Sequence, residues 1–80
     1  MSNYIILFFA HAGAIKFQRF MRKMGIDCQL QPVPRRLSSS CGVCAQLEYD
    51  FDYRNMIDRE HISAIYRKTD DDYILLYSCE

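Results

Sequence analysis

An almost unbroken apolar run near the N-terminus limits what this 80-residue chain can fold into. The run NYIILFF occupies Asn3–Phe9 and is rich in isoleucine and aromatic residues. This pattern is typical of a central strand that is buried on both faces. Because a chain of this length builds only a thin core, we expect a single domain over residues 1–80 with this strand in its centre.

The next elements are predicted from hydrophobic periodicity. Apolar residues fall at helical intervals over Gly13–Met24, with basic residues on the other side, and Gly25 provides a natural helix stop. A second strand is predicted over Asp27–Val33, where two prolines at its end require that it stop or lie at an edge. Strict alternation of apolar and polar residues predicts a third strand over Val43–Tyr53.

The C-terminal third is predicted to hold a second helix and a last strand. The stretch Asp58–His61 is typical of a capped helix start, and a short apolar stripe follows it at Ile62, Ile65 and Tyr66. A charged turn over Thr69–Asp72 then leads to a strand over Tyr73–Cys79. The order β-α-β-β-α-β favours an α+β, ferredoxin-like split βαβ fold: a four-stranded antiparallel sheet, both helices on one face, strands one and three central.

Charge and composition narrow the classes of function. The formal net charge is zero, so we expect neither general nucleic-acid binding nor membrane binding. Residues 1–44 contain six basic residues and a single acidic residue, Asp27, whereas residues 45–80 contain four basic and nine acidic residues. The positive charge of the first half favours an anion or an acidic protein as a partner. A secretory signal requires basic residues before its apolar segment, and no basic residue precedes the first apolar run of this chain. We therefore expect a cytoplasmic protein in which cysteines act as thiols, ligands or catalytic groups.

The pair Cys41-Gly42-Val43-Cys44 is the main chemical feature of the chain. A zinc site needs two further ligands at suitable spacing, and the other cysteines and histidines are scattered singly; we expect no metal within one chain, although a site shared between two chains stays open. A thioredoxin-like site is disfavoured because a strand, not a helix, follows the pair. We expect no other cofactor.

The segment that precedes the pair suits a reactive anionic sulfur. Pro32 and Pro34 restrict the backbone, and Arg35 and Arg36 add two positive charges. Gly42 permits unusual backbone angles and close approach of a ligand, and hydroxyl donors are offered by Ser38, Ser39 and Ser40. These groups favour a thiolate or persulfide on Cys41, since the anion is the nucleophile.

The segment Pro32–Gly42 (PVPRRLSSSCG) resembles the signature P-x-P-R-x-hydrophobic-S-S-x-C-G of a family of short bacterial proteins described as sulfur/selenium (Se/S) carriers. The likeness extends over about residues 3–50. It implies a role in selenium metabolism or sulfur transfer, with Cys41 as the carrier residue and unidentified donor and acceptor proteins as partners. It also implies that residues of the loop shape the site, namely Pro34, Arg35, Ser38, Ser39 and Gly42. A carrier is favoured over a stand-alone enzyme.

The remaining cysteines and polar residues receive separate interpretations. Cys44 follows Cys41 closely enough to form a disulfide and to act as a resolving thiol; it is expected on the polar face of its strand, partly exposed. Cys28 and Cys79 are expected to be buried as small hydrophobic residues. His11 is expected to face solvent or cap a helix, and Asp70–Asp72 to form a solvated turn.

A second class of function is not excluded by these residues. The sheet and the basic helix over residues 13–24 could serve a non-catalytic, regulatory interaction module, or a homodimer. Blocking the Cys41 thiol separates the two hypotheses, because only the carrier needs it.

Overall fold

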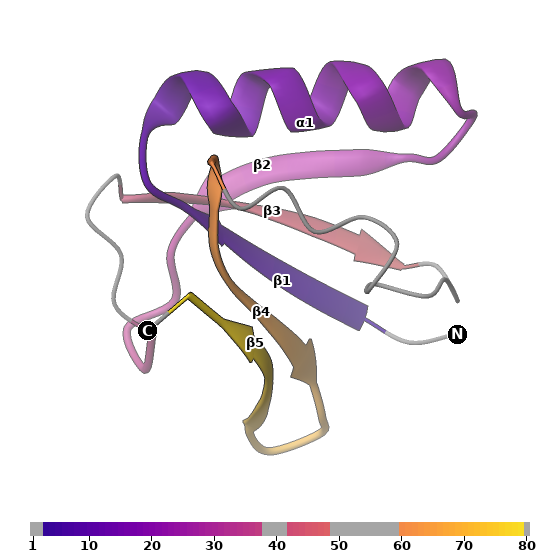
Figure 1. The fold of residues 1–80 in the computed structure, drawn as a ribbon. Coiled ribbons are helices and arrows are strands. Elements are labelled where there is room, and N and C mark those ends of the chain that lie inside the picture. Colours follow the sequence, from indigo (N-terminus) through magenta and orange to yellow (C-terminus); the bar gives the residue numbers. More distant parts are fainter. Residues whose placement is uncertain (1–2, 38–41, 49–59, 80) are drawn as a thin grey trace.

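The computed structural model describes residues 3–37, 42–48 and 60–79, and these residues form five strands and one helix (Figure 1). In chain order the elements are β1 (Asn3–Phe8), α1 (His11–Lys23), β2 (Cys28–Pro32), β3 (Val43–Glu48), β4 (Ile62–Lys68) and β5 (Tyr73–Ser78). The strands make one sheet in the order β2-β3-β1-β4-β5, and every neighbouring pair is antiparallel.

Strand β1 lies in the middle of this sheet, as its apolar sequence predicts. Its neighbours are β3, through pairs such as Ile6 with Ala45, and β4, through pairs such as Ile6 with Ile65. Successive side chains of β1 enter two different clusters, because side chains alternate between the faces of a strand. Ile6 and Phe8 belong to the larger cluster, and Ile5 and Leu7 belong to a smaller one on the other face.

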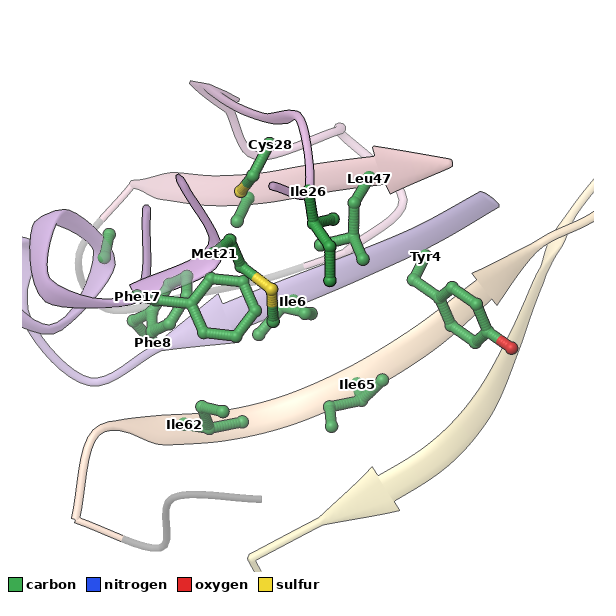
Figure 2. Close-up of a cluster of buried hydrophobic side chains, with 12 residues drawn as sticks. Tyr4, Ile6, Phe8, Phe17, Met21, Ile26, Cys28, Leu47, Ile62 and Ile65 are labelled. Carbon is green, nitrogen blue, oxygen red and sulfur yellow. The ribbon is translucent and has the colours of Figure 1, made fainter. Parts of the chain in front are cut away.

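Helix α1 covers the face of the sheet that carries the larger cluster, over β1, β2 and β3 (Figure 1). It buries Ala14, Phe17 and Met21 against the strands, and the rings of Phe8 and Phe17 are 5.5 Å apart between centroids. Figure 2 shows Phe8, Phe17 and Met21 grouped with Cys28 from β2. The periodicity of the sequence identified this helix correctly, although the helix begins two residues earlier and ends one residue earlier than predicted.

The end of α1 is a Schellman motif centred on Gly25. The Gly25 N–H donates to the Arg22 carbonyl at 3.1 Å, and the Ile26 N–H donates to the Met21 carbonyl at 2.9 Å. Gly25 has a φ of 77°, in the left-handed region that favours glycine. The motif turns Ile26 back onto Met21 in the core (Figure 2) and starts β2 at Cys28.

The predicted second helix and the ferredoxin-like fold are wrong. Residues 62–68 form strand β4 rather than a helix, and β4 raises the number of strands in the sheet from the predicted four to five. The helix was predicted wrongly because the pairing of β4 with β1 is irregular: Leu7 pairs with Ala64, but the next residue, Phe8, pairs with Ile62. This shift leaves one extra residue in β4. Ile62 and Ile65 therefore reach the same face although they are three residues apart, a spacing that resembles a helix.

The other predicted elements are partly or fully confirmed. The second and last strands are observed as β2 and β5, each within its predicted range, and the charged turn lies between β4 and β5. The third strand is observed over Val43–Glu48, while residues 49–53 and the expected helix start at residues 58–59 lie outside the described residues. No helix of the described residues is long and apolar enough to cross a membrane.

Candidate functional site

The chain that leaves β2 packs on the face of the sheet opposite α1. We call Val33–Leu37 the signature arm, because it holds the P-R-R-L part of the signature. Val33 and Leu37 are half-buried against the smaller cluster, whose members are Ile5, Leu7, Cys44 and Ala64. In Figure 1 the arm lies below the sheet, on the side away from the helix. The arm is therefore packed against the protein and not simply a polar surface loop.

Backbone hydrogen bonds fix both ends of the described arm. The Val33 N–H donates to the Gly42 carbonyl at 3.3 Å, so the start of the arm is joined to the residue before β3. The Leu37 N–H donates to the Pro34 carbonyl at 3.0 Å, which closes a turn around the two arginines. Gly42 is exposed and has a φ of 72°, a backbone angle that glycine adopts without strain.

The two arginines of the arm have different surroundings. Arg36 Nη1 donates to the Asp71 carbonyl at 2.6 Å and lies 3.5 Å from Asp72 Oδ1. Arg35 is exposed, and no ion pair joins it to any residue of the described ranges. Both arginines were predicted to act beside the sulfur, whereas in the structure Arg36 contacts the β4–β5 turn.

A shallow hollow separates the arm from that turn. It has a volume of about 270 Å³ and is lined by Pro34, Arg35 and Arg36 on one side and by residues 68–73 on the other. Its cations are Arg35, Arg36 and Lys68, and its acids are Asp70, Asp71 and Asp72. The hollow is thus electrically mixed rather than a simple anion pocket.

The expected reactive residues fall partly outside this geometry. Four of them lie outside the described residues, namely Ser38, Ser39, Ser40 and Cys41. Pro34, Arg35 and Arg36 precede this segment and Gly42 follows it. The hydrogen bond from Val33 to Gly42 joins the two sides. The roles of these residues, including that of Cys41 as the carrier, stay predictions.

The expected exposure of Cys44 is wrong. Its strand face was predicted correctly, but the side chain is fully buried in the smaller cluster, because the signature arm covers that face. Its Sγ donates to the Pro32 carbonyl at 3.7 Å. A pairing with Cys41 is not tested by the described residues, and any attack by Cys44 on a carried sulfur requires that this thiol leave its buried position.

The other two cysteines differ from one another. Cys28 is buried beneath α1, as predicted, and Cys79 is exposed, against the prediction, at the end of β5; both are free thiols. Burial, with smaller effects from Asp27 and Cys44, raises the pKa of Cys28 to about 11. Cys28 is therefore held as a neutral thiol near pH 7, when it is neither a good nucleophile nor a metal ligand.

The described residues hold no group of three or more His, Cys, Asp or Glu side chains that could bind a metal ion. His11 is exposed at the start of α1, as the sequence predicts. The contacts of Arg36 with Asp71 and Asp72 were not predicted from the sequence. The opposite charges of the two segments were the only available signal, because the residues are 35 and 36 positions apart.

The described residues form a small antiparallel α+β protein in which the signature arm packs on the sheet face opposite the helix. A family model described as "Putative Se/S carrier protein-like" matches residues 3–67, which run from β1 through most of β4. The chain belongs to this family. Neither a curated protein nor a solved structure matches it.

Proposed function

We propose that this protein carries sulfur or selenium on Cys41 and passes it from a donor protein to an acceptor protein in the cytoplasm. The observation that supports this proposal most strongly is the anchored signature arm. The family match spans the whole signature, and the arm is packed against the sheet on one side of Cys41 and hydrogen-bonded to Gly42 on the other. Such anchoring restrains the described residues on both sides of Cys41 in the sequence.

The proposed reaction is an exchange between thiolates and persulfides. The Cys41 thiolate attacks the terminal sulfur of a donor persulfide, a bond forms between the two sulfurs, and the donor thiolate leaves. In the second half, an acceptor thiolate attacks the terminal sulfur on Cys41 and Cys41 leaves as a thiolate. The transferred atom keeps its oxidation state, so neither protein is oxidised or reduced. A selenopersulfide reacts in the same way, with selenium as the terminal atom.

The other cysteines contribute little to this reaction as the structure places them. Cys28 is buried and protonated at neutral pH, and Cys44 is fully buried. Cys79 is exposed and would react with sulfur donors without being part of the signature. Any test of Cys41 therefore needs a Cys79→Ser background.

Intact-mass analysis after incubation with a small-molecule persulfide tests the proposal. The Cys79→Ser protein should gain one sulfur atom, which peptide mapping should locate on Cys41, and a thiol acceptor should remove it. The variant Cys41→Ser/Cys79→Ser should gain almost none. Equal sulfur gain by the two proteins would show that Cys41 is not the carrier residue.

A second candidate function is docking of a partner through the outer face of α1. Phe20 and Met24 are 52% and 54% exposed and lie one turn apart on the helix. Basic side chains surround them, including Arg19 and Lys23, and residues 11–24 contain no acid. This combination suits an acidic partner surface with an apolar centre, which we take to be that of the sulfur donor protein.

A comparison of two sulfur donors tests the docking face. Arg19→Glu should slow loading by a persulfide-bearing donor protein and leave loading by a small-molecule persulfide unchanged. Arg67→Glu reverses an exposed charge on β4 and is the matched control. If Arg19→Glu and Arg67→Glu slow loading by the donor protein equally, α1 is not the docking face.

A further inference from the structure

The two faces of the sheet are covered in different ways. On one face the 13-residue helix α1 packs over β1, β2 and β3, and Cys28 is buried in the larger cluster beneath it. On the other face the smaller cluster contains Cys44, and the signature arm packs against it together with Tyr66 and Tyr73. Among the described residues, one buried thiol thus lies under a helix and the other under a five-residue segment.

The signature arm is attached to the rest of the protein by few and weak contacts. Val33 and Leu37 are only half-buried where they pack on the smaller cluster. The hydrogen bond from the Val33 N–H to the Gly42 carbonyl is 3.3 Å long, which exceeds the usual range. Arg36 contacts the β4–β5 turn through a side chain that is 66% exposed, where ion pairs add little stability. The arm can therefore separate from the sheet at a smaller cost in free energy than unfolding of the sheet.

Cys44 is coupled to the arm by its position. Its Sγ donates to the carbonyl of Pro32, the residue directly before the arm, at 3.7 Å, and its side chain is 0% exposed. Close-packed interiors leave no room for a larger group on such a sulfur atom. Ile5 and Leu7 of the same cluster belong to β1, which is paired with a strand on each side. A group attached to Cys44 must therefore displace the arm, because the central strand is held more firmly.

We propose that the signature arm opens without unfolding of the sheet, and that a low-molecular-weight disulfide that reacts with Cys44 in the open state then holds the arm open. Cys44 loses its proton to water, and the thiolate attacks one sulfur of the disulfide. A bond forms between these two sulfurs, the original S–S bond breaks, and the other half leaves as a thiolate. Excess thiol reverses the step by the same exchange.

The consequence is a redox-sensitive switch in the position of the arm. If opening of the arm favours modification of Cys44, modification must favour the open arm by the same factor. The arm carries Pro34, Arg35 and Arg36 of the signature, so the state of the Cys44 thiol controls where these three residues lie. The proposal goes beyond the carrier function and does not rest on it.

Labelling of the two buried thiols with iodoacetamide tests the opening of the arm. The Cys41→Ser/Cys79→Ser protein is labelled in increasing urea, and peptide mapping gives separate rates for Cys28 and Cys44. At low urea Cys44 should react at least about tenfold faster than Cys28, at a rate nearly independent of urea, because a local opening exposes little surface. The rate for Cys28 should rise with the slope of global unfolding measured by circular dichroism. Equal urea dependence at the two cysteines would show that the arm does not open alone and would overturn the proposal.

Two leucine variants test whether the arm controls access to Cys44. Leu37→Ala weakens the packing of the arm and should speed labelling of Cys44 by about five- to tenfold at low urea, with Cys28 unchanged. Leu76→Ala is the matched control, because Leu76 is also a half-buried leucine but packs on the larger cluster. It should leave the labelling of Cys44 at low urea unchanged. Equal acceleration by both variants would mean that access follows general stability, which would overturn the role of the arm.

Amide hydrogen exchange of the mixed disulfide tests the second half of the proposal. Glutathione disulfide is used to modify Cys44 in the Cys41→Ser/Cys79→Ser protein. Exchange at the Val33 amide should become at least about tenfold faster, whereas exchange at the Ile26 amide, which donates to the Met21 carbonyl, should not change. The control carries glutathione on exposed Cys79 in Cys41→Ser/Cys44→Ala and should leave both amides unchanged.

Each other outcome of this exchange experiment contradicts the switch. Unchanged exchange at Val33 would show that the modified thiol does not hold the arm open. Equal acceleration at Val33 and Ile26 would show that the modification unfolds the protein instead of moving the arm. Both experiments use protein that lacks Cys41, so they succeed or fail independently of the carrier function.

Discussion

Cys28 provides a quantitative test of the core, because its burial predicts two linked properties. The side chain is 7% exposed, and burial is the main reason that its pKa rises to about 11. At pH 7.5 the thiolate is then about 3 parts in 10,000, against roughly 3 parts in 100 for a thiol with the ordinary pKa of 9.0. Iodoacetamide should therefore modify exposed Cys79 at least about 100-fold faster than Cys28 in the folded protein.

The same shift in pKa makes stability depend on pH. The folded state keeps Cys28 protonated up to about pH 11, whereas the ordinary value is 9.0. Between these values the unfolded chain binds fewer protons, so the free energy of unfolding falls as pH rises. The loss is about 2 kcal/mol at pH 10.5 and approaches about 3 kcal/mol above pH 11. At pH 7 the contribution is fully present.

Urea unfolding between pH 7.5 and 10.5, followed by circular dichroism under reducing conditions, measures this loss. Cys28→Ala is the reference, because other groups that titrate in this range affect both proteins equally. The difference in stability between the natural chain and the variant should shift by about 2 kcal/mol in favour of the variant over this range. A constant difference, or alkylation of Cys28 within tenfold of the rate of Cys79, would refute the reasoning.

Four further substitutions test the packing of the helix and the backbone next to β3, each by urea unfolding. Met21→Ala removes a fully buried side chain and should cost about 2–5 kcal/mol, whereas Met24→Ala, on the exposed end of the helix, should cost less than about 0.5 kcal/mol. Gly13→Ala would place a Cβ 2.9 Å from the Cβ of His61, so it should destabilise the protein by about 1 kcal/mol or more although alanine favours helices. Gly42→Ala meets no atom within 4 Å but has a φ of 72°, and the backbone strain should cost about 1–2 kcal/mol.

The sequence predicted those elements whose periodicity is regular. The apolar run of β1 is explained by burial on both faces, and the helical spacing of Phe17 and Met21 by the contact of α1 with the sheet. Glycine chemistry at Gly25 predicted the helix end correctly because a Schellman motif depends on local sequence. Hydrophobic periodicity and glycine positions were sufficient in these cases because neither β1 nor α1 contains an inserted residue that breaks its repeat.

The predictions failed where a distant contact decides the structure. The extra residue in β4 is visible only in its pairing with β1, and without it the spacing of Ile62 and Ile65 is indistinguishable from that of a helix. Cys44 was placed on the correct face, but its burial depends on Val33 and Leu37, which cover that face. The contact of Arg36 likewise depends on a turn that arrives 35 residues later.

The central position of β1 also affects the order in which the protein can fold during synthesis. Strand β1 leaves the ribosome before its partners β3 and β4, whose residues are made about 40 and 60 positions later. Its backbone groups and both apolar faces consequently wait for most of the chain, a high-contact-order arrangement that slows folding. Nascent chains that stop before residue 62 should therefore expose β1 and bind chaperones, and release should follow once β4 has emerged.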